Sequence, residues 1–201
     1  MKLMAKRAFD IGMALMALLV LSPILAAIAI WIKLDSPGPA LFRQERVGLG
    51  GRCFQILKFR TMRQCSETNG SLITVGEDAR ITRAGSVLRR YKLDELPQFF
   101  NVLRGEMSVV GPRPEVPRYV ALYSSDVKSI VLSVRPGITD PGSLAFREES
   151  SLLAKAPDPE SHYVNVVVPI KLEHSIQYVR TRNFWSDIQI IGRTLAAIFR
   201  G

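Results

Sequence analysis

The hydrophobic residues of this chain are concentrated in one long segment near its start. The run from Ile11 to Ile32 is almost entirely apolar and is interrupted only by Ser22 and Pro23 near its centre. About 20 apolar residues are enough to cross a bilayer as a helix, so length alone permits a spanning helix. A cleavable signal peptide is disfavoured, because the run continues beyond any cleavage site and Ser22-Pro23 is not a small-residue motif.

The interruption and the flanking charges favour a re-entrant hairpin instead. Proline removes a helical hydrogen bond and disfavours helix at the preceding residue, here Ser22. Each half of the segment has about 10 residues and spans roughly 15 Å, about half of the hydrocarbon core. Basic residues flank both ends: Lys2, Lys6, Arg7, Lys33, Arg43, Arg46 and Arg52. The positive-inside rule then places both ends in the cytoplasm. A kinked spanning helix remains the open alternative.

Downstream, the pattern changes to shorter elements. Residues 40–47 and 52–61 predict two strands, and the glycine-rich segment 48–51 between them predicts a hairpin turn. Residues 64–78 are polar and predict a loop, whereas residues 84–91 and 117–125 predict helices. We therefore expect an α+β fold in which residues 1–35 form the re-entrant membrane segment and residues 36–201 form a domain on the cytoplasmic side.

Helical periodicity returns from Pro169 to the end of the chain. Its last apolar residues recur at helical spacing: Phe184, Ile188, Ile191, Leu195 and Ile198. Such a helix either lies in the membrane interface or packs against the core, and the spacing leaves both interpretations open.

A second helix start is predicted around Asp94, in the stretch 89–98. Pro97 is tolerated only in the first turn of a helix, and Gly105 supplies a stop after the apolar residues that follow. Asp94 is therefore predicted as the N-cap and Glu95 as the first helical residue. Because a helix N-terminus carries partial positive charge, the pKa of Asp94 is expected to fall.

Basic residues next to this acid pair make several chemical roles possible for it. Arg89, Arg90 and Lys92 lie just upstream. Adjacent carboxylates in a cationic setting can hold a divalent metal, attack an electrophile or move a proton. Simple helix capping explains Asp94-Glu95 equally well from these residues alone.

Two further basic sites stand out. Lys58 and Arg60 alternate with apolar residues, so they share one face of the predicted strand. Arg113 lies between Pro112 and Pro114, which restrict the backbone around it. A stiffly held arginine suits a phosphate clamp, although it could also brace a loop against a carboxylate.

Composition narrows the choice of partners. The 201 residues carry a formal net charge of +9, which favours nucleic acid, acidic lipid head groups or phosphorylated substrates. Cys53 and Cys65 lack metal-like spacing and predict free thiols in a reducing compartment. His162 and His174 have no ligand spacing and are interpreted as structural or surface residues.

Taken together, these segments resemble the bacterial sugar transferase family, in the form of small monotopic phosphoglycosyl transferases. The resemblance runs from Lys6 to about Ile138 and returns weakly near Phe184. It is carried by the following segments: Lys6-Arg7-Ala8-Phe9-Asp10, Ser22-Pro23, Ser36-Pro37-Gly38-Pro39, Lys58-Phe59-Arg60-Thr61-Met62, Leu93-Asp94-Glu95-Leu96-Pro97-Gln98, Asn101-Val102-Leu103-Arg104-Gly105, Ser108-Val109-Val110-Gly111-Pro112-Arg113-Pro114 and Arg135-Pro136-Gly137-Ile138-Thr139. Their number and order make the match specific.

The resemblance implies a reaction and its partners. Such enzymes move a sugar-1-phosphate from a UDP-sugar to a polyprenyl (undecaprenyl) phosphate, release UMP and use Mg²⁺, in the first membrane step of surface glycan synthesis. It also implies a location on the cytoplasmic face of the bacterial inner membrane, contact with membrane lipids and no nucleic-acid partner, and it permits a homodimer.

The resemblance also implies roles for particular residues. Asp94 matches the nucleophile of a covalent phospho-sugar intermediate, and Glu95 matches its partner in metal binding or proton handling, so both are candidate Mg²⁺ ligands. Ser22 and Pro23 match the helix-breaking pair of the re-entrant membrane helix. The candidate phosphate- and substrate-binding residues are Lys58, Arg60, Arg89 and Arg113.

The chain departs from the family pattern after Thr139. Many members continue with glycine, tryptophan, alanine and glutamine, whereas this chain continues with Asp140-Pro141-Gly142-Ser143-Leu144-Ala145. This segment is expected to help set the sugar. With no large multispan region before the apolar segment, the chain is expected to be a minimal catalytic form. Two alternatives remain: a membrane-anchored basic adaptor that binds lipid or nucleic acid without catalysis, and a metal-dependent phosphohydrolase.

Overall fold

The computed structural model describes residues 3–63, 73–76, 78–146 and 149–199. Its elements are α1 (Leu3–Asp35), β1 (Leu41–Val47), the 3₁₀ turn η1 (Leu49–Gly51), β2 (Cys53–Phe59), α2 (Arg83–Arg90), the 3₁₀ turn η2 (Leu93–Glu95), α3 (Gln98–Arg104), β3 (Ser108–Val110), α4 (Pro117–Ala121), α5 (Ser125–Val131), β4 (Gly137–Thr139), α6 (Pro141–Ala145), α7 (Glu149–Ala154), α8 (Pro159–His162), the π-helical turn η3 (Tyr163–Val167), α9 (Val168–Thr181) and α10 (Phe184–Phe199). The expected α+β class is confirmed.

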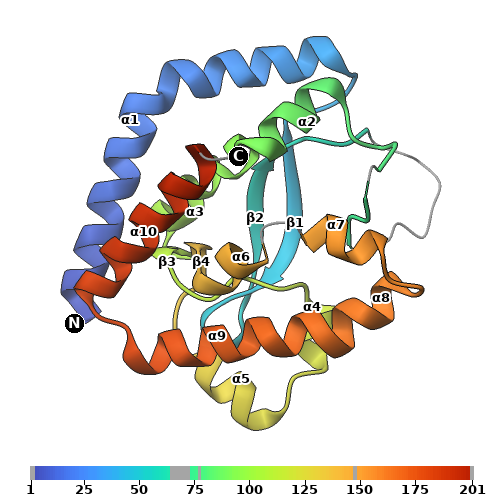
Figure 1. Ribbon diagram of the computed structural model, residues 1–201. Coiled ribbons are helices and arrows are strands. Elements are labelled where there is room, and N and C mark those ends of the chain that lie inside the picture. Colours follow the sequence, from blue (N-terminus) through green and yellow to red (C-terminus); the bar gives the residue numbers. More distant parts are fainter. Residues whose placement is uncertain (1–2, 64–72, 77, 147–148, 200–201) are drawn as a thin grey trace.

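The antiparallel hairpin of β1 and β2 lies at the centre of the molecule, with α1 along one side and α9 along another (Figure 1). Its two strands lie within the predicted ranges, and η1 forms the predicted glycine-rich turn. A second, parallel pair joins β3 to β4. The polar segment 64–78, which was predicted as a loop, falls largely outside the described residues, as does Cys65. Cys53 is an exposed free thiol.

Helix α1 continues through Ser22 and Pro23 but bends midway along its length (Figure 1). The break expected at this point is therefore a bend. Pro23 has no N–H to donate to the carbonyl of Leu19, four residues earlier. The Ser22 hydroxyl donates to that same carbonyl at 2.9 Å. Because the carbonyl regains a partner, helical hydrogen bonding resumes beyond the proline.

The two ends of α1 pack against the rest of the molecule, whereas its middle does not. Ala14 lies in a core cluster with Val102 of α3, and Ile32 lies in a cluster with Leu88 of α2. Between them, large apolar side chains are exposed to between 48 % and 74 %: Leu15, Met16, Leu19, Val20 and Ile24. By length and composition, α1 is the one described helix that could cross a membrane. A contiguous exposed apolar surface of this kind marks a membrane or protein contact.

The sequence of the C-terminal helix α10 left open whether it packs against the core or lies at an exposed surface, and the structure shows both for different residues. Ile190 is buried in a cluster with Val109, Val110 and Tyr178. Trp185, in contrast, is 72 % exposed. The first turn of α10 also meets the start of α1, since the rings of Phe9 and Phe184 lie edge to face at 5.4 Å. One face of α10 therefore joins the core, and the other remains open beside α1 (Figure 1).

Candidate functional site

The acid pair lies in η2, a short turn between α2 and α3, and not at the start of α3. The N-cap of α3 is Pro97, and α3 begins at Gln98, so the predicted N-cap role of Asp94 is wrong. Lys92 forces the difference, because its left-handed backbone (φ 56°) turns the chain into a separate 3₁₀ turn. It is the one non-glycine residue with positive φ in the described chain. Strained residues of this kind concentrate at functional sites. Gly105 ends α3 in left-handed geometry, as predicted.

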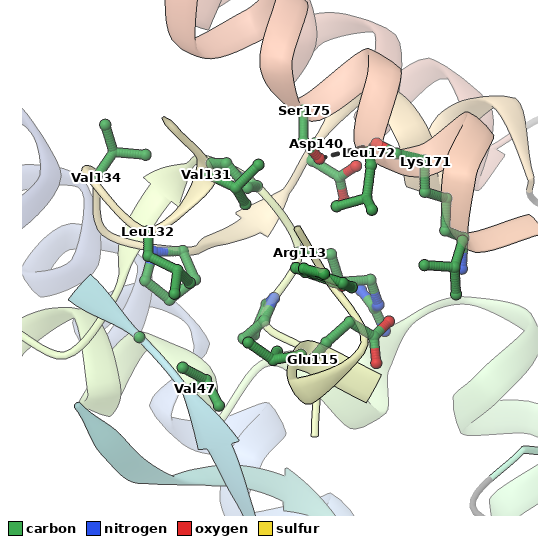
Figure 2. A pocket seen from close by; sticks show the side chains of 17 residues that line it. Val47, Arg113, Glu115, Val131, Leu132, Val134, Asp140, Lys171, Leu172 and Ser175 are labelled. Carbon is green, nitrogen blue, oxygen red and sulfur yellow. Dashed lines mark hydrogen bonds between the residues drawn. The ribbon is translucent and has the colours of Figure 1, made fainter. Parts of the chain in front are cut away.

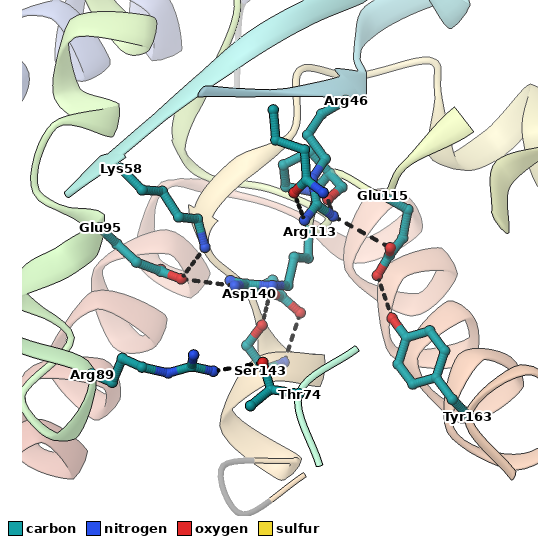
Figure 3. Close-up of polar contacts among 12 residues, drawn as sticks. Arg46, Lys58, Thr74, Arg89, Glu95, Arg113, Glu115, Asp140, Ser143 and Tyr163 are labelled. Carbon is teal, nitrogen blue, oxygen red and sulfur yellow. Dashed lines mark hydrogen bonds and ion pairs between the residues drawn. The ribbon is translucent and has the colours of Figure 1, made fainter. Parts of the chain in front are cut away.

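Two cations from distant elements converge on Glu95 (Figure 3). Lys58 Nζ, from β2, lies 2.9 Å from Glu95 Oε1, and Arg113 Nη2 lies 2.7 Å from the same oxygen. Burial by itself raises the pKa of Glu95, but Arg113 and Lys58 outweigh it and hold that pKa well below its ordinary value. Glu95 is thus a carboxylate that is ionised at neutral pH and held in place by two ion pairs.

Asp94 has the opposite environment, although it is adjacent in sequence. Its Oδ1 atom is buried and has no hydrogen-bond partner within the described residues. Burial raises the pKa of Asp94, and the charge of Glu95 raises it further, against the opposing effect of Lys58. The expected fall of this pKa is therefore wrong, since desolvation outweighs the nearby cations. A desolvated carboxylate oxygen without a partner is a reactive group, whereas a paired one is not.

Arg113 is held on a stiff segment, as its flanking prolines predict. The carbonyl of Pro112 accepts a hydrogen bond from Gly137 N at 2.9 Å, and the carbonyl of Pro114 accepts one from Arg46 Nη1 at 3.0 Å. The cavity behind Arg113 has a volume of about 30 Å³, which leaves room for little more than water (Figure 2). Arg113 is therefore fixed from behind, and its guanidinium faces Glu95.

A polar pocket of about 460 Å³ lies beside the acid pair. Its lining includes six basic side chains: Arg46, Arg89, Arg90, Lys92, Arg113 and Lys171. Arg89 donates to the hydroxyl of Thr74 at 2.9 Å and has no carboxylate within 4.0 Å among the described residues. Glu115 is the one carboxylate in the lining; it is bound to Arg46 and to the Tyr163 hydroxyl (Figure 3). Such an excess of positive charge suits a ligand with several negative charges.

Two of the basic residues that line this pocket were predicted from the sequence. Arg89 and Arg113 were predicted, and both line it. Arg46 and Lys171 were not predicted as ligand-binding residues, because β1 and α9 are separated by more than a hundred residues in the chain. Within the described residues, no local motif marks either side chain. Only the packing of α9 across the molecule brings them together.

Arg60 is directed away from this pocket. Its guanidinium donates to the carbonyls of Pro37 and Ser36, at 2.6 and 2.7 Å, and to the Ser36 hydroxyl at 3.0 Å. Only 4 % of Arg60 is exposed. Sequence alternation predicted that Arg60 and Lys58 share one strand face, but β2 ends at Phe59, so Arg60 lies beyond the strand. Lys58 reaches Glu95, whereas Arg60 reaches the segment that follows α1. Arg60 ties the end of α1 to the hairpin.

The Arg60→Lys substitution tests this structural role. Lysine cannot reproduce the planar fork that reaches several acceptors at once. We expect the free energy of unfolding to fall by about 1–3 kcal/mol, because buried carbonyls lose charged donors. Arg43→Lys, at an exposed position of β1, is the matched control and should unfold like the wild type. Equal stability of all three proteins in chemical denaturation would contradict the role.

The segment that departs from the family pattern lies directly at the site. Asp140 caps α6, accepting the Ser143 N–H at 2.9 Å, and Ser143 lines the polar pocket (Figure 3). Ser143 also lines a second, apolar groove of about 240 Å³, together with Leu144. The expected influence of this segment on the sugar remains a prediction, and its position beside Arg113 is compatible with it.

The structure defines an α+β protein that combines a long apolar helix, a buried acid pair and a pocket lined by basic side chains. The chain belongs to the bacterial sugar transferase family, whose model matches residues 1–201. It is 40 % identical over 198 residues to the UDP-N-acetylgalactosamine-undecaprenyl-phosphate N-acetylgalactosaminephosphotransferase of Aeromonas hydrophila. The alignment covers 98 % of this chain and 44 % of that relative.

Two further relatives carry a different sugar in their names. The UDP-glucose:undecaprenyl-phosphate glucose-1-phosphate transferase of Escherichia coli (strain K12) is 38 % identical, over 98 % of this chain and 40 % of its own length. The protein of the same name in Caulobacter vibrioides is 38 % identical, over 96 % of this chain and 69 % of its own length. The chain therefore spans less than half of the first two relatives and about two thirds of the third.

Proposed function

We propose that this protein transfers a sugar-1-phosphate from a UDP-sugar to undecaprenyl phosphate and releases UMP. The main observation behind the proposal is that the two adjacent acids, Asp94 and Glu95, have different environments. Glu95 is fixed by Lys58 and Arg113, whereas Asp94 keeps a buried oxygen without a partner beside a cationic pocket. A diphosphate bound by those cations would present its phosphorus to that oxygen. The names of the relatives supply the substrate classes.

The reaction proceeds in two displacements at one phosphorus. A carboxylate oxygen of Asp94 forms a bond to the sugar-bearing phosphorus, and the bond to the bridging oxygen breaks, so that UMP leaves with the electron pair. A phosphate oxygen of undecaprenyl phosphate then attacks the same phosphorus. The acyl phosphate bond breaks, and Asp94 is regenerated as a carboxylate. Neither step requires an oxidant or a net proton.

The basic residues of the pocket make this attack between anions feasible. Lys58 and Arg113 are oriented by their ion pairs with Glu95, while Arg89 and Lys92 line the space that a diphosphate would occupy. Fixed positive groups lower the barrier by offsetting the negative charge that the attacking carboxylate brings to the phosphate. Glu95 acts here through the cations that it positions.

A magnesium ion fits the same acid pair. Mg²⁺ is commonly held by one or two carboxylates together with substrate phosphates, so a third protein ligand is not required. No group of three or more potential metal ligands occurs within the described residues. Asp94 and Glu95 would hold the ion, and the carboxylate of Asp94 has a second oxygen for this besides the partnerless Oδ1 that faces the phosphorus. When bound, Mg²⁺ neutralises phosphate charge.

The defining experiment is a screen of UDP-sugars for UMP release by the membrane-embedded protein. With the correct sugar, sustained release of UMP requires undecaprenyl phosphate, and one equivalent of UMP per protein is released without it. Free sugar phosphate formed without a lipid acceptor would identify a phosphohydrolase. An absence of UMP with every UDP-sugar would overturn the proposed transfer.

We propose further that α1 is a re-entrant anchor with both ends on the cytoplasmic face of the inner membrane. Two observations support this topology. Both ends of α1 pack against the same domain, because Arg7 donates to the carbonyl of Val102 and Asp35 accepts the N–H of Ala84. The middle of α1, around the bend, exposes a run of large apolar side chains from Leu15 to Ile24. A straight spanning helix would separate its ends by the thickness of the bilayer.

Cysteine accessibility tests this topology. In a protein without Cys53 and Cys65, we expect Met4→Cys and Arg43→Cys to react with an impermeant thiol reagent only in inside-out vesicles. Leu19→Cys, at the bend, should be protected by lipid from either side. The wild-type Cys53 reports the face of the catalytic domain. Labelling of the Met4 and Arg43 positions from opposite faces would establish a spanning helix instead.

A further inference from the structure

The apolar groove beside the acid pair has a composition that sets it apart from the polar pocket. It lies between α1, α3, α6 and α10, and its volume is about 240 Å³. Its walls are mainly aliphatic and aromatic: Met13, Leu96, Phe99, Val109, Ile138, Leu144, Ile191, Leu195, Ala197 and Ile198. A concave site of this kind binds a hydrocarbon, because burial of apolar surface drives association.

The groove has a charged end, where it meets the polar pocket. Lys92, Arg113 and Ser143 line both spaces, and Glu95 lines the groove. An occupant that complements this arrangement is a hydrocarbon with one anionic head, its charge at Lys92 and Arg113. That position brings the head group beside the acid pair, where an acceptor phosphate has to arrive.

The opposite wall of the groove faces the membrane segment. Met13 belongs to α1, and Leu195 of α10 lines the groove while remaining 52 % exposed. The apolar lining of the groove therefore reaches the surface of the protein at Leu195. The first turn of α10 meets α1, where the rings of Phe9 and Phe184 lie 5.4 Å apart.

We propose that this groove holds the isoprene units next to the phosphate of the polyprenyl phosphate acceptor, with that phosphate between Lys92 and Arg113. The inference rests on the proposed function and adds to it a site for the lipid. The polar pocket then takes the diphosphate of the UDP-sugar. The two substrates reach the acid pair from different sides, which allows the same phosphorus to be attacked twice.

Two neighbouring alanines of α10 provide a matched test. Ala197 lines the groove, whereas Ala196 is exposed and does not line it. Ala197→Phe fills the groove, so we expect the KM for undecaprenyl phosphate to rise at least about tenfold. Ala196→Phe places the same ring about 100° around the helix, at an exposed position outside the groove, and should keep the wild-type KM. Equal KM values in both variants would overturn the proposal.

Photoaffinity labelling makes the test independent of turnover. A farnesyl phosphate with a photoreactive group near its phosphate should label α10 or α6 peptides of the wild type, and Ala197→Phe should label at least about tenfold less. Excess undecaprenyl phosphate should remove the label, whereas phosphatidylglycerol should not. Labelling confined to the bend of α1, or competition by phosphatidylglycerol, would show that the groove takes ordinary bilayer lipid.

The outcomes separate the two proposals. Specific labelling of the groove without UMP release from any UDP-sugar would leave the lipid site standing and overturn the transferase function. UMP release that depends on undecaprenyl phosphate, with no labelling of the groove, would support the transferase function and overturn the lipid site. If Ala197→Phe also loses the UMP burst that occurs without acceptor, the groove is needed to keep the acid pair in place. That result would overturn the lipid site as well.

Discussion

Asp94→Asn is expected to abolish UMP release, by at least about 10³-fold, without loss of the fold. Asparagine matches the shape of aspartate but cannot form the acyl phosphate. With a UDP-sugar labelled in the sugar phosphate, the denatured wild-type protein should retain label and the variant should retain none. Asp126→Asn, at an exposed position of α5, is the control and should behave like the wild type. Sustained turnover by Asp94→Asn would contradict the nucleophile.

The same substitution is expected to raise stability. Burial raises the pKa of Asp94, so this group contributes stability that is fully present below its unfolded-state pKa and is lost as pH rises through the folded-state pKa. Asparagine does not ionise and escapes this loss. The melting temperature of the variant should therefore exceed that of the wild type at pH 7, and the difference should shrink toward pH 4. A lower melting temperature at pH 7 would contradict the buried, unpaired carboxylate.

The pH dependence of activity follows from the same displacement. Only the ionised form of Asp94 attacks phosphorus, so activity should fall as pH drops through its pKa. Because burial raises that pKa, the acid limb of kcat/KM for the UDP-sugar should lie above the range of an ordinary aspartate. An acid limb at or below the ordinary range would indicate that bound substrate or metal restores the charge.

Glu95→Gln is expected to have the second largest effect, in the opposite direction on stability. Lys58 and Arg113 lose the oxygen that they share, and both remain largely buried without a counter-charge. We expect the free energy of unfolding to fall by about 2–3 kcal/mol. Activity should fall as well, because the cations lose their orientation. Glu45→Gln, at an exposed position of β1, should change neither property.

The pH window of this effect follows from the lowered pKa of Glu95. A group with a lowered folded-state pKa contributes stability above its unfolded-state pKa, and that stability is lost as pH falls through the folded-state value. The difference in melting temperature between wild type and Glu95→Gln should thus be full at neutral pH and shrink as pH falls below about 4.5. A difference that grows on acidification would contradict the two ion pairs.

Features that depend on neighbouring residues could be predicted from the sequence. The apolar run around Ser22-Pro23, the hairpin of β1 and β2, and the end of α3 at Gly105 follow from local periodicity and backbone preference. The partner of the Ser22 hydroxyl could also be anticipated, because the proline frees one particular carbonyl. The resemblance to a family selected Asp94 and Glu95 from among many acidic residues.

Only the tertiary structure decided what each of these residues experiences. Lys92 takes a left-handed conformation that separates the acid pair from α3, which local capping rules do not predict. Asp94 and Glu95 are adjacent and chemically similar, yet their pKa values move in opposite directions, because only Glu95 forms ion pairs with Lys58 and Arg113. Desolvation and ion pairing depend on groups that are distant in the chain. Sequence spacing cannot report them, since the packing of β2 and the segment after β3 creates those contacts.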